Sequence, residues 1–179
     1  MARGRNKKII TWNCESLPAK KQELDILITD QNPLAICLQD TRLNKQSEEL
    51  YKISGYTPYF KSVDTSPSGV AIYVKNNIPQ SQVTILTNLQ ALAVRVTMNG
   101  KTYVITSIYI PPSTVPTIND FDSFISQLKS NSYLLNGDFN AHSIFWGSSR
   151  TCARGNVTEQ VLQKHQLIPI NTIHNTFLS

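Results

Sequence analysis

The sequence lacks any long apolar run, and this excludes a membrane-spanning helix. Such a helix needs roughly 18–20 consecutive apolar residues, and no segment of the 179 residues approaches that length. The basic N-terminus is followed by the short stretch Ile9–Trp12, which is too short for the apolar region of a signal peptide. We therefore expect a protein that is not secreted, has no membrane partner and acts in the nucleus or the cytoplasm.

Cysteine is also scarce. The three cysteines, Cys14, Cys37 and Cys152, are scattered, and no CxxC motif is present. This pattern argues against a disulfide framework or a zinc site and favours buried, reduced thiols. Repeats and low-complexity tracts are absent as well, so the length favours a single domain. Apolar residues make up 40% of the chain, which is enough to form a core.

Positive charge is concentrated at the N-terminus. The formal net charge is +5, and four basic residues without any acidic residue lie within residues 1–8. These residues are Arg3, Arg5, Lys7 and Lys8. Such a cluster suits a DNA backbone, because each neutralised phosphate releases counterions; a solvated terminus without a partner is the alternative. We divide the chain into a basic arm, residues 1–8, and a folded domain, residues 9–179.

Apolar patterning predicts an α/β chain. Residues 8–13 and 34–38 have the composition of strands, and apolar residues at helical spacing follow Pro18 between them. Asn99-Gly100 predicts a hairpin turn, because both positions of that turn need positive φ. The other predicted strands are 69–74, 91–97, 101–110, 132–135 and 167–170. Two further helices are expected, one capped by Asn119 or Asp120 and one around 155–165.

Polar residues stand next to the ends of several predicted strands. They are Asn13, Asp40, Tyr109, Asp138 and Asn140. Each has an ordinary explanation when taken singly, such as a turn residue or a strand aromatic. In layered α/β folds, however, strand ends converge on one rim, where substrates usually bind. We expect these five side chains to share one cleft.

The same positions carry a resemblance to a known family. The motifs are Thr11-Trp12-Asn13, Leu38-Gln39-Asp40-Thr41, Ser68-Gly69-Val70-Ala71, Tyr109-Ile110-Pro111-Pro112 and Gly137-Asp138-Phe139-Asn140-Ala141-His142. In this order they resemble the endonuclease/exonuclease/phosphatase superfamily. With Phe145-Trp146-Gly147-Ser148 and Arg154-Gly155, the chain is closest to the endonuclease domain of jockey-type non-LTR retrotransposons. The resemblance implies a four-layer α-β-β-α sandwich of two mixed sheets.

The resemblance also implies a role for each strand-end residue. Asp40, where the family usually has Glu, would bind Mg²⁺ or Mn²⁺. Asn13 would belong to the same metal site and would orient the acidic metal ligand and the phosphate. Tyr109 and Asn140 would hold the phosphate. Asp138 would position or deprotonate the attacking water, or stabilise the leaving group. His142 is typical of the retrotransposon branch, and we expect it to be structural or to contact DNA.

The function implied by the resemblance is that of a metal-dependent DNA endonuclease that nicks target DNA for retrotransposition. Its partners would be DNA and a C-terminal reverse transcriptase domain in the parent polyprotein. An inactive remnant that at most binds nucleic acid is one alternative, and a phosphatase or RNase of the same superfamily is another. For the endonuclease, the residues expected to contact phosphate or DNA are Tyr109, Asn140, His142 and the basic residues of the arm, Arg3, Arg5, Lys7 and Lys8.

Two departures from the family pattern bear on activity. Asp40 is one methylene shorter than Glu, and Mg²⁺ tolerates little slack at about 2.0–2.1 Å, so we expect weak metal binding. Neither His165 nor His174 is directly preceded by Ser-Asp, so neither histidine belongs to the terminal Ser-Asp-His motif of the family. We therefore expect the last strands of the second half to be missing. On this view the chain by itself does not nick DNA at a useful rate.

Overall fold

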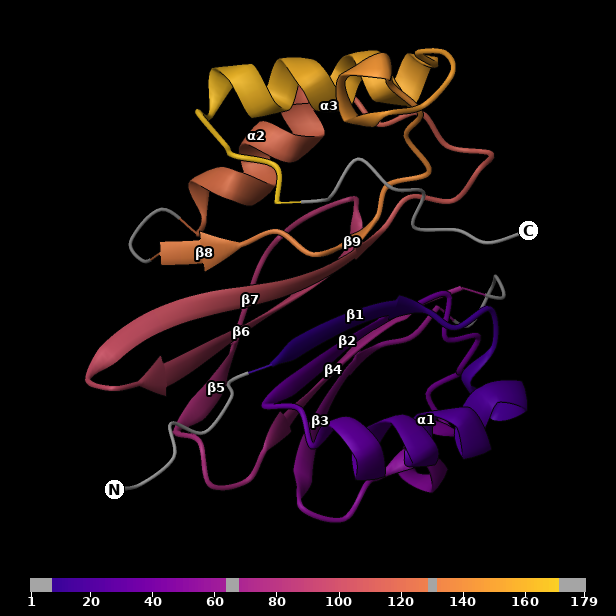
Figure 1. The fold of residues 1–179 in the computed structure, drawn as a ribbon, viewed down its shortest axis with the longest axis vertical. Helices are drawn as coiled ribbons and strands as arrows, with labels where there is room; N and C mark the ends of the chain where they lie inside the picture. The colour runs from indigo at the N-terminus through magenta and orange to yellow at the C-terminus, as the bar shows by residue number, and fades with distance from the viewer. Residues whose placement is uncertain (1–7, 64–67, 129–131, 171–179) are drawn as a thin grey trace.

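The computed structural model describes residues 8–63, 68–128 and 132–170 (Figure 1). Two β-sheets pack face to face, with helix α1 (Leu17–Gln31) outside one sheet and helices α2 (Ile118–Ser126) and α3 (Ala153–Lys164) outside the other. Short 3-10 helices lie at Glu48–Tyr51 and Ile144–Trp146, the latter labelled η2 here. The expected four-layer sandwich is confirmed. Within the described residues, no helix is long and apolar enough to cross a membrane.

The first sheet is mixed and has the strand order β1-β2-β4-β3. Its strands are β1 (Ile9–Asn13), β2 (Ala35–Gln39), β3 (Tyr56–Lys61) and β4 (Val70–Lys75). β1 and β2 run parallel, because α1 returns the chain to the starting end of the sheet. β4 runs antiparallel to both of its neighbours.

The second sheet is mixed as well. Its strands are β5 (Gln80–Val83), β6 (Gln90–Met98), β7 (Lys101–Tyr109), β8 (Ser132–Leu134) and β9 (Gly137–Asp138). β5, β6 and β7 are antiparallel, whereas β8 and β9 pair with β7 in parallel. Asn99 and Gly100 have φ of 52° and 73°, so the hairpin predicted between β6 and β7 is confirmed.

Strand alternation distributes the apolar side chains between the layers. On β2, Ala35 and Cys37 face the second sheet, whereas Ile36 and Leu38 pack with the residues of α1. On β7, Ile105 lies between the sheets and Val104 and Ile108 lie under α2 and α3. Both strands are therefore buried on both faces, as continuous apolar runs indicate. The apolar side chains between the sheets hold the two sheets together.

Some sequence predictions need correction. Thr117, not Asn119 or Asp120, caps α2; Asp120 completes a capping box by accepting from the backbone N–H of Thr117. The strand predicted at 167–170 is wrong, because these residues form no strand and Ile168 is 85% exposed. β3 and β5 are not among the predicted strands, because their polar residues and Pro58 obscure the alternation of apolar residues.

Gly137 lets β9 approach β7 closely, so a side chain at this position should lower the stability of the fold. A Cβ at Gly137 would lie 2.1 Å from the carbonyl oxygen of Ile108, which is backbone and has little freedom to move. We expect Gly137→Ala to lower the free energy of unfolding by about 3 kcal/mol or more. Gly55→Ala is the matched control, since a Cβ there meets nothing within 4 Å. It should lower the free energy of unfolding by only about 1 kcal/mol, the cost of the positive φ of 82° for a residue with a side chain. Equal losses in urea titrations would contradict the steric explanation.

Candidate active site between the two sheets

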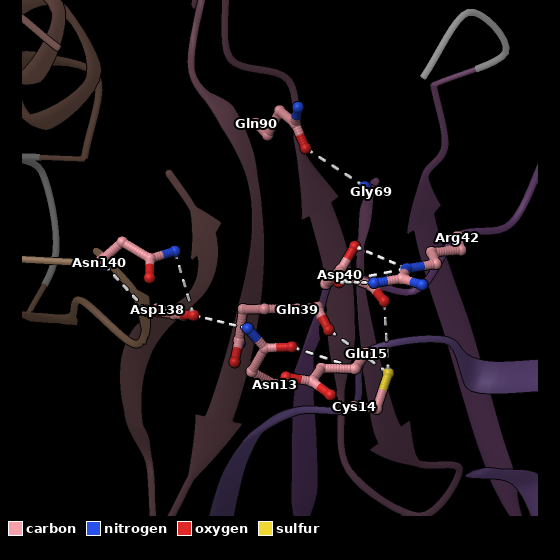
Figure 2. Close-up of polar contacts among 10 residues, drawn as sticks. All are labelled: Asn13, Cys14, Glu15, Gln39, Asp40, Arg42, Gly69, Gln90, Asp138 and Asn140. Carbon is pink, nitrogen blue, oxygen red and sulfur yellow. Dashed lines mark hydrogen bonds and ion pairs between the residues drawn. The ribbon is translucent and has the colours of Figure 1, made fainter. Parts of the chain in front are cut away.

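The candidate site lies where strands of both sheets end. β1 and β2 end side by side, with Asn13 opposite Gln39. In the other sheet, Tyr109 at the end of β7 lies opposite Asp138 of β9. β9 also contacts β1 and β2 across the sandwich. Residues far apart in the sequence therefore meet at one edge (Figure 2).

Asp138 is at the centre of a hydrogen-bonded group. The Nδ2 atom of Asn13 donates to its Oδ2 atom over 2.5 Å, across 125 positions of sequence. The backbone N–H of Asn140 donates to Oδ1 over 2.9 Å, and the Asn140 side chain donates to Oδ2 over 3.4 Å. The Asn140 side chain also donates to the carbonyl of Ile110 over 3.0 Å. Amide donors from both sheets thus orient this carboxylate.

A buried polar link lies beneath this group. Gln39 is almost fully buried, and its Nε2 atom donates to Ser107 Oγ over 2.9 Å. Ser107 is also buried and donates to the carbonyl of Leu38 over 2.8 Å. Near the rim, Gln90 accepts a hydrogen bond from the backbone N–H of Gly69 over 3.2 Å. These bonds connect the sheets directly below and beside the candidate site.

Asp40 has a different partner from the other predicted residues. Its side chain is 6% exposed and forms an ion pair with Arg42, with Nη2 and Oδ2 3.0 Å apart. The Nε atom of Arg42 also donates to the carboxylate, over 3.3 Å to Oδ2. Asp40 has a positive φ of 51°, which turns the chain sharply after β2. The guanidinium therefore neutralises the carboxylate that the sequence analysis assigned to the metal.

Tyr109 is buried and lies near both acidic residues. Burial raises the pKa of its phenol, and the negative charges of Asp40 and Asp138 raise it further. A raised pKa keeps the phenol protonated at neutral pH, so its hydroxyl group can donate a hydrogen bond. This is the state needed to bind a phosphate oxygen.

Glu15, which the sequence motifs do not predict as a site residue, lies next to this hydrogen-bonded group. Its backbone N–H donates to Asn13 Oδ1 over 3.1 Å. Asp40 is the main cause of the raised pKa of Arg42 and burial is the main cause for Tyr109, and the charge of Glu15 adds a smaller increase to each pKa. Glu15 therefore adds a second carboxylate to the edge that carries Asp40 (Figure 2). The signal available in the sequence was its position two residues after Asn13, in the turn that follows β1.

The donor chemistry of this edge fits a hard divalent cation. Mg²⁺ uses oxygen ligands and commonly takes only one or two protein carboxylates. Asp40 supplies one, and Glu15 lies in the turn after β1 whose next residue, Ser16, donates its backbone N–H to Asp40 O over 2.9 Å. The described part of the chain has no group of three or more His, Cys, Asp or Glu side chains placed to bind a metal. Arg42 would also have to release Asp40, at least in part. The residues therefore fit a metal completed by water and substrate oxygens.

His142 and the basic residues lie outside this hydrogen-bonded group. The side chain of His142 is exposed, while its carbonyl accepts from the backbone N–H of Cys152 over 2.9 Å. Lys8 precedes β1 at the end opposite Asn13 and donates to Gln31 over 2.7 Å, so it is not brought to the site. Arg3, Arg5 and Lys7 lie outside the described residues.

Comparison with known proteins supports the resemblance inferred from the sequence. A family model described as "Endonuclease-reverse transcriptase" matches residues 103–179. The RNA-directed DNA polymerase from mobile element jockey of Drosophila melanogaster is 28% identical over 176 residues. That match includes 96% of this chain but only 19% of the jockey protein, so the chain spans about one fifth of that relative.

Solved structures share the fold. The endonuclease domain of TRAS1, a telomere-specific non-LTR retrotransposon, superposes with a TM-score of 0.69 at 19% identity, covering 88% of this chain and 71% of that domain. An AP endonuclease from Leishmania major gives a TM-score of 0.72 at 14% identity, covering 88% and 66%. These structures confirm the predicted α/β architecture.

The Asn13–Asp138 bond predicts a pH-dependent loss of stability in Asn13→Asp. The new carboxylate would lie next to that of Asp138, and repulsion between two negative charges at this distance favours protonation of one of them. The folded variant therefore binds a proton at a pH at which the unfolded chain does not. Its stability should therefore fall as pH rises. We expect a deficit of about 2 kcal/mol relative to the original chain at pH 8, of the size of one to two pKa units of repulsion, and almost none at pH 4.

Asn13→Ala is the matched control, because it removes the hydrogen bond without adding charge. Its deficit should change much less between pH 4 and pH 8 than that of Asn13→Asp, because no second charge is added. Thermal unfolding followed by circular dichroism from pH 4 to pH 8 makes the comparison. A pH-independent deficit in Asn13→Asp would contradict the geometry described for this pair.

Proposed function

Because the chain resembles the endonuclease/exonuclease/phosphatase superfamily, and within it jockey-type retrotransposon endonucleases, we propose that it hydrolyses phosphodiester bonds in DNA. The reaction would use Mg²⁺ or Mn²⁺ and produce the nick from which reverse transcription starts. The observation that carries this proposal is the group formed by Asn13, Asp138 and Asn140 beside the neutral phenol of Tyr109. It combines an oriented carboxylate with hydrogen-bond donors for an anion.

In the proposed reaction, Asp138 orients the attacking water or takes its proton. The amide groups that hold its oxygens limit rotation of the carboxylate, which favours one direction of attack. One N–H of the Asn13 side chain is used on Asp138, and the other can donate to a phosphate oxygen. Tyr109 supplies a second neutral donor. These groups favour the charge that accumulates on phosphate during hydrolysis.

Asn140 has a more restricted role than the resemblance implies. Both N–H groups of its side chain have acceptors, namely Ile110 O and Asp138 Oδ2. To hold the phosphate through Nδ2, it would have to exchange the longer of these bonds, 3.4 Å, for a phosphate oxygen. We propose that Asn140 positions Asp138 before substrate binds and contacts the phosphate only afterwards.

Asp40 and Glu15 would hold the divalent metal, which when bound would neutralise phosphate charge and stabilise the leaving oxygen. DNA would be the substrate, and a reverse transcriptase domain of the parent polyprotein would use the nicked end. The Asp40–Arg42 ion pair favours a second candidate, a nucleic-acid-binding domain without turnover, because it occupies the main metal carboxylate.

The nicking hypothesis is tested with Asp138→Asn, which keeps the shape of the side chain and removes its charge. Supercoiled plasmid and Mg²⁺ are incubated with the chain, and with a chimaera that adds the segment of the jockey relative that follows the matched region. We expect the chimaera to nick and its Asp138→Asn form to lose at least about 100-fold in rate, as general-base loss typically costs. Asp25→Asn on exposed α1 is the control and should nick normally. Nicking that survives Asp138→Asn would exclude the assigned role.

Arg42 should weaken metal binding, because it competes for Asp40. We expect Arg42→Gln to bind Mn²⁺ about fivefold more tightly, as removal of one nearby charge is worth about 1 kcal/mol in a solvated site. Isothermal titration calorimetry measures this directly. The control is Lys21→Gln, which removes the cation of an exposed ion pair on α1 and should leave affinity unchanged. Equal or weaker binding by Arg42→Gln would contradict competition.

A further inference from the structure

The segment that follows Asn140 exposes two large apolar side chains. Ile144 is 71% exposed and Phe145 is 67% exposed, and both lie in the short helix η2. Single exposed apolar residues are common on protein surfaces. Here two adjacent ones project from the loop that begins at the candidate site, and Trp146 packs edge-on against Phe145 with ring centroids 6.3 Å apart.

The backbone that carries this pair is held firmly in place. Ser143 is fully buried, accepts from the backbone N–H of Phe145 over 2.9 Å and donates to Glu159. Trp146 donates from its indole nitrogen to Ala141 O over 2.9 Å. A Cβ at Gly155 would lie 1.9 Å from His142 O, so α3 is packed directly against this loop. The exposure of Ile144 and Phe145 is therefore built into an ordered element.

Arg154 couples this loop to the candidate site. Its Nε atom donates to Asn140 O and its Nη1 atom to Pro112 O, each over 2.6 Å. Asn140 in turn donates its backbone N–H to Asp138. A strand bound at Asp138 and Asn140 would thus pass a surface whose position is fixed relative to the site.

The charge of the segment indicates the class of ligand. Residues 139–158 contain no Asp or Glu, and their charged side chains are Arg150 and Arg154, with His142 titratable. The elements packed against the segment contribute Glu159, which is occupied by Ser143. An apolar, aromatic tip on a cationic base complements a polyanion that has flat apolar faces, and nucleic-acid bases have such faces.

We propose that Ile144 and Phe145 form a base-contacting element that stacks on, or inserts between, bases next to the phosphate held by Asn13 and Tyr109. This inference rests on the proposed function and specifies its substrate contact. Two side chains are too small for a stable protein interface, which buries about 800 Å² on each partner. One aromatic ring is, however, sufficient to stack on a base or open a base step.

The test measures binding to a fluorescein-labelled DNA duplex by anisotropy, in EDTA so that no cleavage occurs. The variants are Phe145→Ala, Phe145→Trp and the control Leu86→Ala, which removes an 81% exposed apolar side chain outside this loop. We expect Phe145→Ala to weaken binding about fivefold or more, the loss of one stacked base. Phe145→Trp should retain affinity, and Leu86→Ala should change nothing.

A second probe isolates the base contact. In a duplex whose central bases are replaced by abasic sites, Phe145→Ala should lose little relative to the original chain. The salt dependence of binding should be the same for both, because stacking releases no counterions. An equal loss on both duplexes would overturn the proposal.

Other outcomes separate this inference from the proposed function. If the original chain does not bind duplex at low salt, both fail. If it binds and Phe145→Ala binds equally well, only the base-contacting role fails. A change in sedimentation coefficient for Phe145→Ala, with unchanged DNA affinity, would assign the pair to contacts between copies of the chain and also overturn the proposal.

Discussion

The arrangement of the candidate site depends on hydrogen bonds that cross between the two sheets. Asn13 reaches Asp138 at the edge, and Gln39 reaches Ser107 in the interior below. Each such bond contributes only about 1 kcal/mol net, but breaking one partner leaves a buried polar group that costs more. The bonds therefore add little stability and mainly determine how the two sheets are placed relative to each other. They permit one register between the sheets, in which the polar ends of β1 and β9 meet.

Apolar side chains fill the layers of the sandwich, and their burial stabilises this arrangement of the two sheets. Alternate residues of β2 and β7 face opposite layers, so each sheet is covered on both sides. Polar groups are consequently displaced to the strand ends. The chain turns sharply there, and Glu15, Asp40 and Asn140 all have positive φ. Non-glycine residues in this region cost on the order of 1–3 kcal/mol each and cluster at functional sites.

At the same edge, the ion pair that stabilises Asp40 competes with the proposed binding of a metal by the same carboxylate. Arg42 satisfies a carboxylate that would otherwise be buried with uncompensated charge. A hard cation at Asp40 would have to displace or share with that guanidinium. In the loop that follows Asn140, apolar side chains are exposed instead of buried, although hydrogen bonds hold the backbone that carries them. Both features are understandable if a phosphate and its neighbouring bases complete the site.

The sequence by itself determined the main elements and the strand-end positions. Apolar runs and the Asn99-Gly100 turn were sufficient for β1, β2, β4, β6 and β7, because period and turn chemistry are local properties. They were insufficient for β3 and β5, because the polar residues of these strands and Pro58 obscure the alternation, although each strand pairs with the one that follows it in the chain. Only the tertiary structure decided that Asp40 pairs with Arg42 and that Glu15 joins the site. Side-chain partners depend on where sharp turns direct each group, and spacing along a chain does not contain that information.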